Sequence, residues 1–488
     1  MIPNVTITKL DGQTGVVRPG ADGILLILAP SEKGQLVPAS YAKTKDVSDE
    51  YGAGLLPEFA SFVLDRTKKP IVAVRGSASV AAVLGAVTAV GAGTSVVTVS
   101  GAPLDDYRGI VKVIAGGTIG VSGATYKYSL DGGVNWSAEL ALGVAVSVVL
   151  AGSGITVNFA AGTLLADSTF SFAATAARFQ NSDIVTALEA IRTSTLRFEA
   201  LLVAGPLDAT MVATIQTWVT AREAEGRYYT FLGSPRWKTS VETEAAYKAA
   251  LDPIFAATVA ASGLVCADSF EATSAITGRV QQRDFALAVA ARSMAVDIGV
   301  SPSWVALGPL DGCVIKDAKG NPLHHDEGQS PGLSDTRFTV ARTFGGQDDP
   351  EGTFINLPLL FSQAGSDYVI YPHMRVMNRA CSIAKQLLTK RLQSGVEKVP
   401  DPNIPNKAVI AEYEAAEIEN EIVVTLRGEL TESKKRASDA GFVLSRSDDL
   451  SSNGLHTLTG DVWIVPLAYV GKFDIGAKFV RRPVQATA

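Results

Sequence analysis

Cysteine and histidine are scarce in this chain of 488 residues, which contains three cysteines and four histidines. Cys266, Cys313 and Cys381 lie far apart among apolar neighbours, so we interpret them as buried thiols and not as a disulfide framework or a metal site. Long apolar runs are also missing, because no stretch approaches the roughly 18 to 20 uninterrupted apolar residues of a membrane span. The N-terminus lacks the basic and then apolar pattern of a secretory signal. We therefore expect synthesis in a cytoplasm and no membrane insertion.

Charged residues are few, at 19% of the chain against 47% hydrophobic residues, and the net charge is −6. No block of Lys and Arg supplies the concentrated positive charge that phosphate backbones attract, which argues against nucleic acid as the main partner. A chain this apolar has less polar surface than a monomer usually presents. We therefore expect part of its apolar surface to be buried between subunits.

Motifs of catalysis and of nucleotide binding are missing as well. The chain contains no convincing nucleophile elbow, dinucleotide fingerprint or Walker loop, and Gly76-Ser77-Ala78-Ser79 is only a weak lookalike that we interpret as a linker. His324-His325-Asp326-Glu327 is the only cluster with metal-ligand residue types. Adjacent histidines in a flexible polar loop rarely converge on one ion, so we assign no metal, no cofactor and no catalytic residue.

What the chain does contain is an alternation of strand and helix signals. A buried strand is expected over residues 24–29, a helix over 57–67 and a strand over 71–74. The alternation returns after residue 177, with helices expected over 183–193, 209–225, 239–261 and 283–296 and strands over 198–204, 228–232 and 264–267. Strands that alternate with helices predict a mostly parallel sheet covered on both faces.

Residues 79–177 differ from the portions on either side. Charged residues nearly vanish there, and Gly, Ala, Val, Thr and Ser dominate in short runs. Short strands between Gly-rich turns are typical of a small sandwich or barrel, and residues 126–136 resemble a hairpin with Asp131 and Gly132 in its turn. Because the α/β pattern stops before this stretch and resumes after it, we expect a β-sandwich-like domain inserted into an exposed loop.

Two long helices are expected in the C-terminal portion, over residues 375–393 and 406–426. The first is basic and amphipathic, and the second has an acidic outer face. Pro400, Pro402 and Pro405 break the chain between them, so the pair is expected to form a helical hairpin. The charged residues that we place off the apolar stripes, on the surface of these helices, include Arg375, Arg379, Lys385, Glu414, Glu417 and Glu421.

Both ends of the chain carry the pattern of an isolated strand, in which apolar residues alternate with polar residues or glycine. Such a strand presents unpaired N–H and C=O groups that require a partner. We therefore expect residues 1–20 and 461–488 to be arms that complete sheets of other subunits. The alternating apolar residues are Val5 and Ile7 in the first arm and Phe473, Ile475, Ala477 and Phe479 in the second.

Three segments of the chain resemble the sheath proteins of contractile phage tails. Residues 198–208 and 218–235 have the strand, the Pro/Gly turn, the Ala/Glu-rich helix end and the proline-terminated strand of that family. Residues 368–378 are similar to the tyrosine-rich strand that precedes an Arg-containing helix in sheath proteins. The resemblance covers everything except residues 79–177.

This resemblance implies a structural subunit of the virion, made in the cytoplasm of a bacterial host. In the family, subunits stack as hexameric rings around a tail tube, add terminal strands to a neighbour's sheet and contract to drive the tube through the host envelope. The implied partners are further copies of the chain, the tail tube protein, and baseplate and tail terminator proteins. The C-terminal helices would then form the inner surface, and the inserted domain would point outward.

The expected fold is a multidomain α+β and α/β chain with a mostly parallel α/β middle domain. Its parts are an N-terminal arm (1–20), an α/β domain (21–78 and 178–345) with an inserted all-β domain (79–177), a C-terminal helical domain (346–460) and a C-terminal strand arm (461–488). Two alternatives remain open. One is another polymerising protein of a phage tail or a surface layer. The other is an α/β hydrolase-like enzyme with a β-rich binding insertion and an unrecognised triad.

Overall fold

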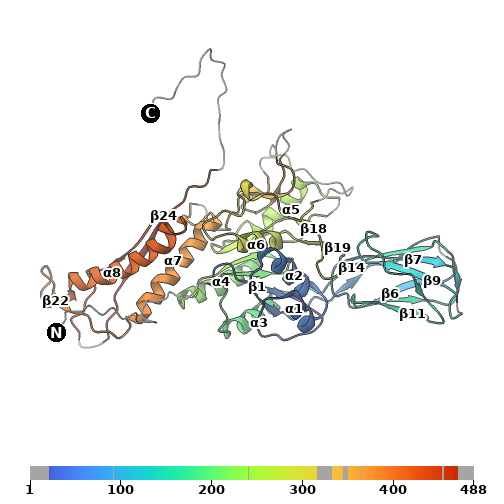
Figure 1. Ribbon diagram of the computed structural model, residues 1–488, viewed down its shortest axis with the longest axis horizontal. Helices are drawn as coiled ribbons and strands as arrows, with labels where there is room; N and C mark the ends of the chain where they lie inside the picture. The colour runs from blue at the N-terminus through green and yellow to red at the C-terminus, as the bar shows by residue number, and fades with distance from the viewer. Residues whose placement is uncertain are drawn as a thin grey trace, which may run out of the picture.

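The computed structural model describes residues 21–470, apart from residues 92, 122, 240, 316–331, 345–349, 364 and 453–454. The molecule is elongated, with an α/β body at its centre, an all-β unit at one end and a helical unit at the other (Figure 1). Each of these parts encloses its own hydrophobic cluster. The predicted mixed α/β architecture is confirmed.

A six-stranded sheet forms the centre of the body, in the order β17-β16-β15-β1-β3-β2. Every residue of β1 is buried, as expected of a strand with helices on both faces of its sheet. Only β2 (Ala39–Tyr41) is antiparallel to its neighbour, so the predicted mostly parallel sheet is present. The parallel strands are β1 (Leu25–Ala29), β3 (Ile71–Arg75), β15 (Ala200–Val203), β16 (Thr230–Gly233) and β17 (Gly263–Val265).

Helices cover this sheet, and α2 contacts α1 and α6 whereas α3 contacts α4. The helix predicted over residues 239–261 is shorter than expected, because the Thr243 side chain caps its start by accepting the N–H of Ala246 at 3.2 Å. Helix α1 was not predicted. The helices are α1 (Thr44–Tyr51), α2 (Leu55–Thr67), α3 (Asn181–Arg192), α4 (Ala209–Ala224), α5 (Glu244–Phe255) and α6 (Phe285–Ala295).

Short elements complete the body. The antiparallel pair β18–β19 joins β17 to α6, and it was not predicted from the sequence. These elements are β18 (Ser269–Thr273), β19 (Val280–Asp284), β20 (Ala341–Arg342), β21 (Phe354–Ile355) and the 3₁₀ turns η1 (Val305–Leu307) and η2 (Ser334–Thr336).

The all-β unit lies between β3 and α3 in the sequence. Its largest sheet has the order β10-β9-β7-β14-β4, with β5 paired to β14, and it lies with the sheet β11-β12-β6 and the pair β13-β8 around one core. Strands β9 and β10 pair as predicted for a hairpin, but ten residues connect them and Asp131 lies early in that connection. The strands are β4 (Val83–Leu84), β5 (Thr88–Val90), β6 (Val97–Gly101), β7 (Tyr107–Ala115), β8 (Gly117–Thr118), β9 (Thr125–Ser129), β10 (Leu140–Ala141), β11 (Ser147–Leu150), β12 (Ile155–Phe159), β13 (Thr163–Leu164) and β14 (Thr169–Thr175).

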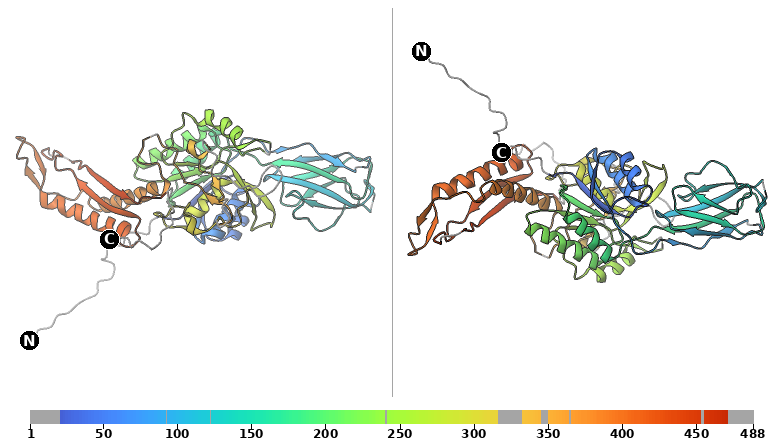
Figure 2. Two further views of the ribbon diagram at one scale, coloured as in Figure 1. Left: turned by 90° about the horizontal axis from the view of Figure 1, so that it is seen from above. Right: turned by 90° about the horizontal axis from the view of Figure 1, so that it is seen from below.

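The chain enters and leaves the all-β unit at adjacent points. Val80 and Arg178 form an antiparallel bridge in which each N–H donates to the other residue's carbonyl oxygen at 3.0 Å. Figure 2 shows the unit projecting from the body on these two crossings. This connection is the geometry that lets a domain be inserted into a loop of another domain.

We expect residues 79–177, produced alone, to fold into the same unit. Their apolar side chains close a core without residues from the body, and the side chains that pair with the body at the root of the unit are mainly charged groups, which water can solvate. A β-type circular dichroism spectrum with one cooperative thermal transition would support independent folding. A fragment that melts without cooperativity would show that the body is required.

The helical unit contains α7 (Tyr371–Lys390) and α8 (Glu412–Arg427), which continues into a π-helical turn, η3 (Gly428–Glu432). Both predicted helices are present, but α8 starts six residues later than expected, because β22 (Lys398–Pro400) and β23 (Ala408–Ile410) pair in the connection. The antiparallel strands β24 (Ala437–Leu444) and β25 (Gly460–Pro466) cover these helices. Helices and strands together enclose the third core.

Candidate assembly interface

The two-stranded sheet of the helical unit has unpaired edges. Strands β24 and β25 pair along their whole length, from Ala437 opposite Pro466 to Leu444 opposite Gly460. Among the described residues, no third strand pairs with either of them. Isolated two-stranded sheets are marginal in water, and this one is stabilised on one face by α8. Its β25 edge therefore offers main-chain donors and acceptors on a supported platform, whereas on the β24 edge the Leu444 N–H already donates to Glu419 at 2.7 Å and the Ala440 carbonyl oxygen accepts from Arg427 at 3.3 Å.

The outer face of this sheet carries exposed apolar side chains next to two aspartates, Asp439 and Asp461. Val443, Trp463 and Val465 are 52%, 37% and 46% exposed. Gly441 lies opposite Trp463, and a Cβ atom there would come within 2.3 Å of the indole ring, so glycine leaves the room that the ring occupies. Exposed apolar side chains beside an open strand edge are typical of a protein interaction site.

The sequence prediction for this region was wrong in one respect. Residues 461–488 were assigned to an exchanged arm, whereas residues 460–466 form β25 and pair with β24 of the same chain. The partner strand was not recognised because it combines Gly441 with small and polar residues. The residues predicted for strand exchange, Val5, Ile7, Phe473, Ile475, Ala477 and Phe479, lie outside the described residues and stay a prediction.

The chain is fixed to its own subunit directly after β25. The Nε2 atom of His373 on α7 lies 2.9 Å from the Leu467 carbonyl oxygen, and the Tyr469 hydroxyl donates to the Gly299 carbonyl oxygen at 2.8 Å. The ring centroids of His373 and Tyr469 are 5.3 Å apart. Any segment that follows residue 470 therefore begins at a defined place, where α7 meets the body.

Arg375 and Arg379 are not surface residues, contrary to the prediction. The Arg375 side chain is 0% exposed and its Nε pairs with Glu199, which precedes β15. Arg379 is 8% exposed, and its Nη2 lies 3.0 Å from Glu429 Oε2 on the π-helical turn. Both arginines lie off the apolar stripe of α7, as predicted, but that side of the helix faces the body and the π-helical turn.

The other predicted charged residues remain on the outside, where several are partly neutralised. Lys385 is exposed and donates to the carbonyl oxygen of Glu225 at the end of α4. Arg391 donates to Glu417 at 3.0 Å and to Glu421 at 2.8 Å, which joins the end of α7 to α8. Glu414 accepts the N–H of Glu397. The acidic face of α8 is thus partly compensated within the chain, and Glu417 stays 67% exposed.

The carboxyl ends of the parallel strands, where α/β proteins usually bind ligands, meet the all-β unit here. A cavity of about 380 Å³ lies at this junction. Its buried carboxylate, Asp284, accepts the Gly205 N–H at 2.8 Å and the Trp237 Nε1–H at 2.7 Å, and burial raises its pKa. Arg178 on the same wall pairs with Asp106. These polar groups bind one another, which indicates a junction between two units more than a catalytic site.

The described residues supply neither a cluster of metal ligands nor a reactive thiol. Among them, no three His, Cys, Asp or Glu side chains converge as they would around a metal ion, and His324 to Glu327 lie outside the described residues. The three cysteines are free, and Cys266 and Cys313 are buried as predicted, whereas Cys381 is only half-buried. Burial raises the pKa of the Cys381 thiol to about 11, which disfavours a reactive thiolate. None of the described helices combines the length and apolarity needed to cross a membrane.

Comparisons with known proteins identify one family for this chain. In structure, the chain is similar to a sheath tail protein from Listeria innocua, at 13% identity and a TM-score of 0.44, over 92% of this chain and 96% of the other. It is also similar to a sheath tail protein from Desulfitobacterium hafniense, at 13% identity and a TM-score of 0.45, over 95% and 100% of the two chains. No curated protein matches it in sequence. A family model described as DUF2586, N-terminal domain, matches residues 2–350, which is more than half of the sequence, and the chain therefore belongs to the DUF2586 family.

Proposed function

We propose that this protein is the structural subunit of a contractile tail sheath, and that it polymerises by strand addition to the β24–β25 sheet. The open β25 edge of this sheet and the exposed apolar side chains beside it carry the proposal. A strand added at such an edge forms main-chain hydrogen bonds that do not depend on side-chain detail. The occupants are the terminal arms of neighbouring copies, residues 1–20 and the residues after 470.

Strand addition suits a polymer that must shorten without breaking. The linked strands hold neighbouring subunits together while the rest of each subunit moves as a rigid body. Each 100 Å² of apolar surface newly buried in the contracted lattice contributes about 2.5 kcal/mol, at about 25 cal/mol per Å². Summed over many subunits, such gains drive contraction without nucleotide hydrolysis.

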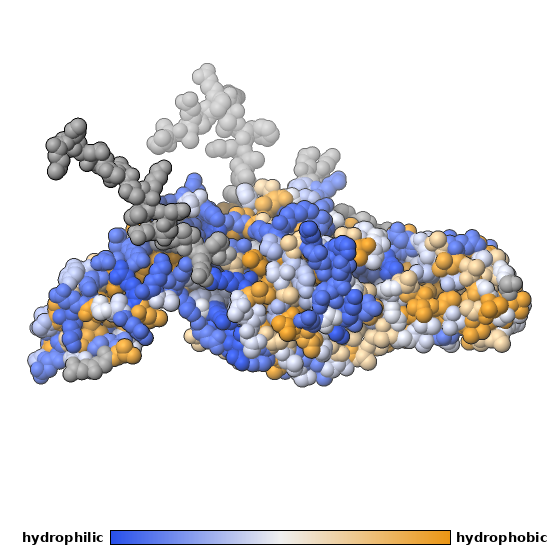
Figure 3. Space-filling view, turned by 60° about the horizontal axis from the view of Figure 1, so that its bottom comes forward, coloured by the Kyte–Doolittle hydropathy of each residue, from blue (hydrophilic) through white to orange (hydrophobic). Residues whose placement is uncertain are grey.

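The elongated shape fits a radial orientation in stacked rings. The helical unit and the all-β unit lie at opposite ends of the molecule (Figure 2). With the helical unit innermost, the exposed part of the α8 acidic face, including Glu417, is directed at the tail tube protein. The all-β unit then points outward, and on the face seen in Figure 3 it shows more apolar surface than the body. Baseplate and tail terminator proteins bind the two ends of the polymer in the virion.

Negative-stain electron microscopy of the purified full-length protein tests this function. We expect hollow striated tubes, because the subunits are proposed to stack as rings. Flat lattices or lone rings would favour another polymerising protein of a tail or a surface layer. Dispersed monomers at every protein concentration would contradict the sheath role.

A further inference from the structure

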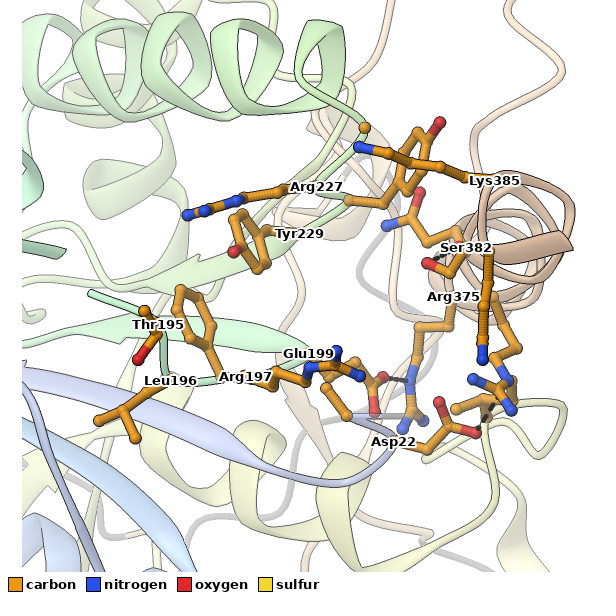
Figure 4. A pocket seen from close by; sticks show the side chains of 18 of the residues that line it. Asp22, Thr195, Leu196, Arg197, Glu199, Arg227, Tyr229, Arg375, Ser382 and Lys385 are labelled. Atoms are coloured by element: carbon orange, nitrogen blue, oxygen red, sulfur yellow. Dashed lines mark hydrogen bonds and ion pairs between the residues drawn. The ribbon is translucent and has the colours of Figure 1, made fainter. Parts of the chain in front are cut away.

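A cavity of about 610 Å³ lies between α7 and the amino ends of β1, β15 and β16 (Figure 4). Asp22, Glu199 and Tyr229 come from the residues that lead into these three strands, and Arg375 reaches them from α7. This edge of the sheet is opposite to the one where α/β proteins usually bind ligands. The sheath role proposed above does not use the cavity.

The walls of the cavity are strongly cationic. Only two acidic side chains, Asp22 and Glu199, line it, and both are engaged by arginines of α7. Arg197, Arg227 and Lys390 are exposed at its mouth. The cationic lining residues are Arg197, Arg227, Arg375, Arg379, Lys385 and Lys390.

Arg375 is the most unusual of these residues. Its side chain is 0% exposed and its Nε pairs with Glu199, yet Nη1 and Nη2 are buried without a hydrogen-bond partner among the described residues. Buried donors are almost always paired, because an unpaired donor loses its hydration and gains nothing in return. A guanidinium with two free donors on the wall of a cavity is therefore a site that lacks its acceptor.

We propose that this cavity binds an oxyanion, a carboxylate or phosphate group, on the Nη1 and Nη2 edge of Arg375. The planar fork of a guanidinium matches the two oxygens of such a group with two parallel charge-assisted hydrogen bonds. Arg379 lies beside it, and the exposed cations at the mouth attract anions from solution. The oxyanion is either a side chain of a second copy of this chain or a free anion.

Calorimetric titration of the unassembled full-length protein tests the binding. The probes are inorganic phosphate and glutarate, with NaCl at equal ionic strength as the reference. We expect saturable binding of at least one probe and a higher thermal midpoint in its presence. Because the measurement uses the unassembled chain, its result is independent of the sheath role.

Variants separate a specific site from general charge attraction. Arg375→Lys keeps a cation opposite Glu199 but removes the fork, and we expect roughly tenfold weaker binding. Lys45→Gln tests general charge attraction, because it removes one positive charge from a side chain on α1 that is 80% exposed, and it should bind like the original protein. If Arg375→Lys does not fold, the double variant Arg197→Gln and Lys390→Gln at the exposed mouth should weaken binding severalfold. Equal affinity in all folded variants, or no binding of either probe, would overturn the proposal.

A second measurement identifies the source of the oxyanion. If a second copy supplies a carboxylate, saturating glutarate or phosphate should reduce polymer formation. If the occupant is a free anion, polymerisation should be unchanged by the probes, and a phosphate or carboxylate compound should be released when the purified protein is denatured. Either result supports the site and assigns its occupant.

Discussion

A chain that ends at Val470 should remain a folded monomer and form no polymers. It retains β25 and the contacts of His373 and Tyr469, so the core of the helical unit stays covered. It lacks the alternating residues from Phe473 to Phe479 that we expect to pair with a neighbouring sheet. Thermal unfolding should be nearly unchanged, whereas electron microscopy and analytical ultracentrifugation should show monomers only.

The residue at which the chain is truncated determines whether the experiment reports on strand exchange or on misfolding. A deletion that starts at Asp461 would also remove β25 and expose the apolar side chains of β24, so a loss of polymers would then report on misfolding. A matched pair of full-length variants provides the control. The variant Phe473→Ser, Ile475→Ser and Phe479→Ser should abolish polymers. The variant Lys472→Ser and Lys478→Ser changes the other face of the expected strand and should still form polymers. Normal tubes from the chain that ends at Val470 would rule out exchange of the C-terminal arm.

Arg283→Ala should destabilise the protein by about 3 to 5 kcal/mol, the cost of leaving a buried charge without its partner. The Arg283 side chain is 5% exposed and donates to both carboxylate oxygens of Asp105 at 2.7 Å. Asp105 is 3% exposed and belongs to the all-β unit, so this pair joins that unit to β19 of the body. Chemical denaturation followed by tryptophan fluorescence measures the loss, because Trp237 lies close to this junction.

Two measurements distinguish lost pairing from lost packing. The double variant Arg283→Met and Asp105→Leu removes both charges and should recover most of the stability. The deficit of Arg283→Ala should also shrink between about pH 7 and about pH 5. Burial already raises the pKa of the neighbouring Glu58 and Arg283 opposes this rise, so without Arg283 the Glu58 carboxyl becomes easier to protonate in the folded state. A carboxyl whose pKa is raised in the folded state takes up a proton on folding, so the free energy of unfolding rises as the pH falls towards that pKa. The loss of stability in Arg283→Ala should therefore be smaller at about pH 5 than at about pH 7. A loss that grows on acidification would contradict the proposed role of the ion pair.

The strands of the body could be predicted where the local pattern of apolar residues matches the burial of the strand. Strands β1, β3 and β15 are apolar runs in a sheet covered on both faces, and their sequences suffice to identify them. Helix α1 was missed because only Val47 and Tyr51 face the core in an otherwise polar segment. Strand β24 was missed because its pairing with β25 and its packing on α8 stabilise it, more than its own residues do.

The candidate sites were predictable only in part. The amphipathic pattern of α7 correctly separates its apolar stripe from Arg375 and Arg379, but a pattern along one helix does not show what lies opposite its polar side. The partner of Arg375 is Glu199, 176 residues away in the sequence. Long-range ion pairs of this kind leave no periodic signal, so both the burial of these arginines and the cationic cavity required the three-dimensional fold.

The bridge between Val80 and Arg178 makes the α/β body a natural display scaffold. The chain leaves and returns through one antiparallel residue pair, so the body fixes the spacing of the two crossings, and beyond them it contacts the all-β unit through side-chain pairs such as Arg283 with Asp105. A foreign domain whose termini are adjacent could be grafted at this point, with Arg283 and Glu58 adjusted to their new surroundings. In a polymer of many subunits, such grafts would be presented at regular intervals along the outside of a tube.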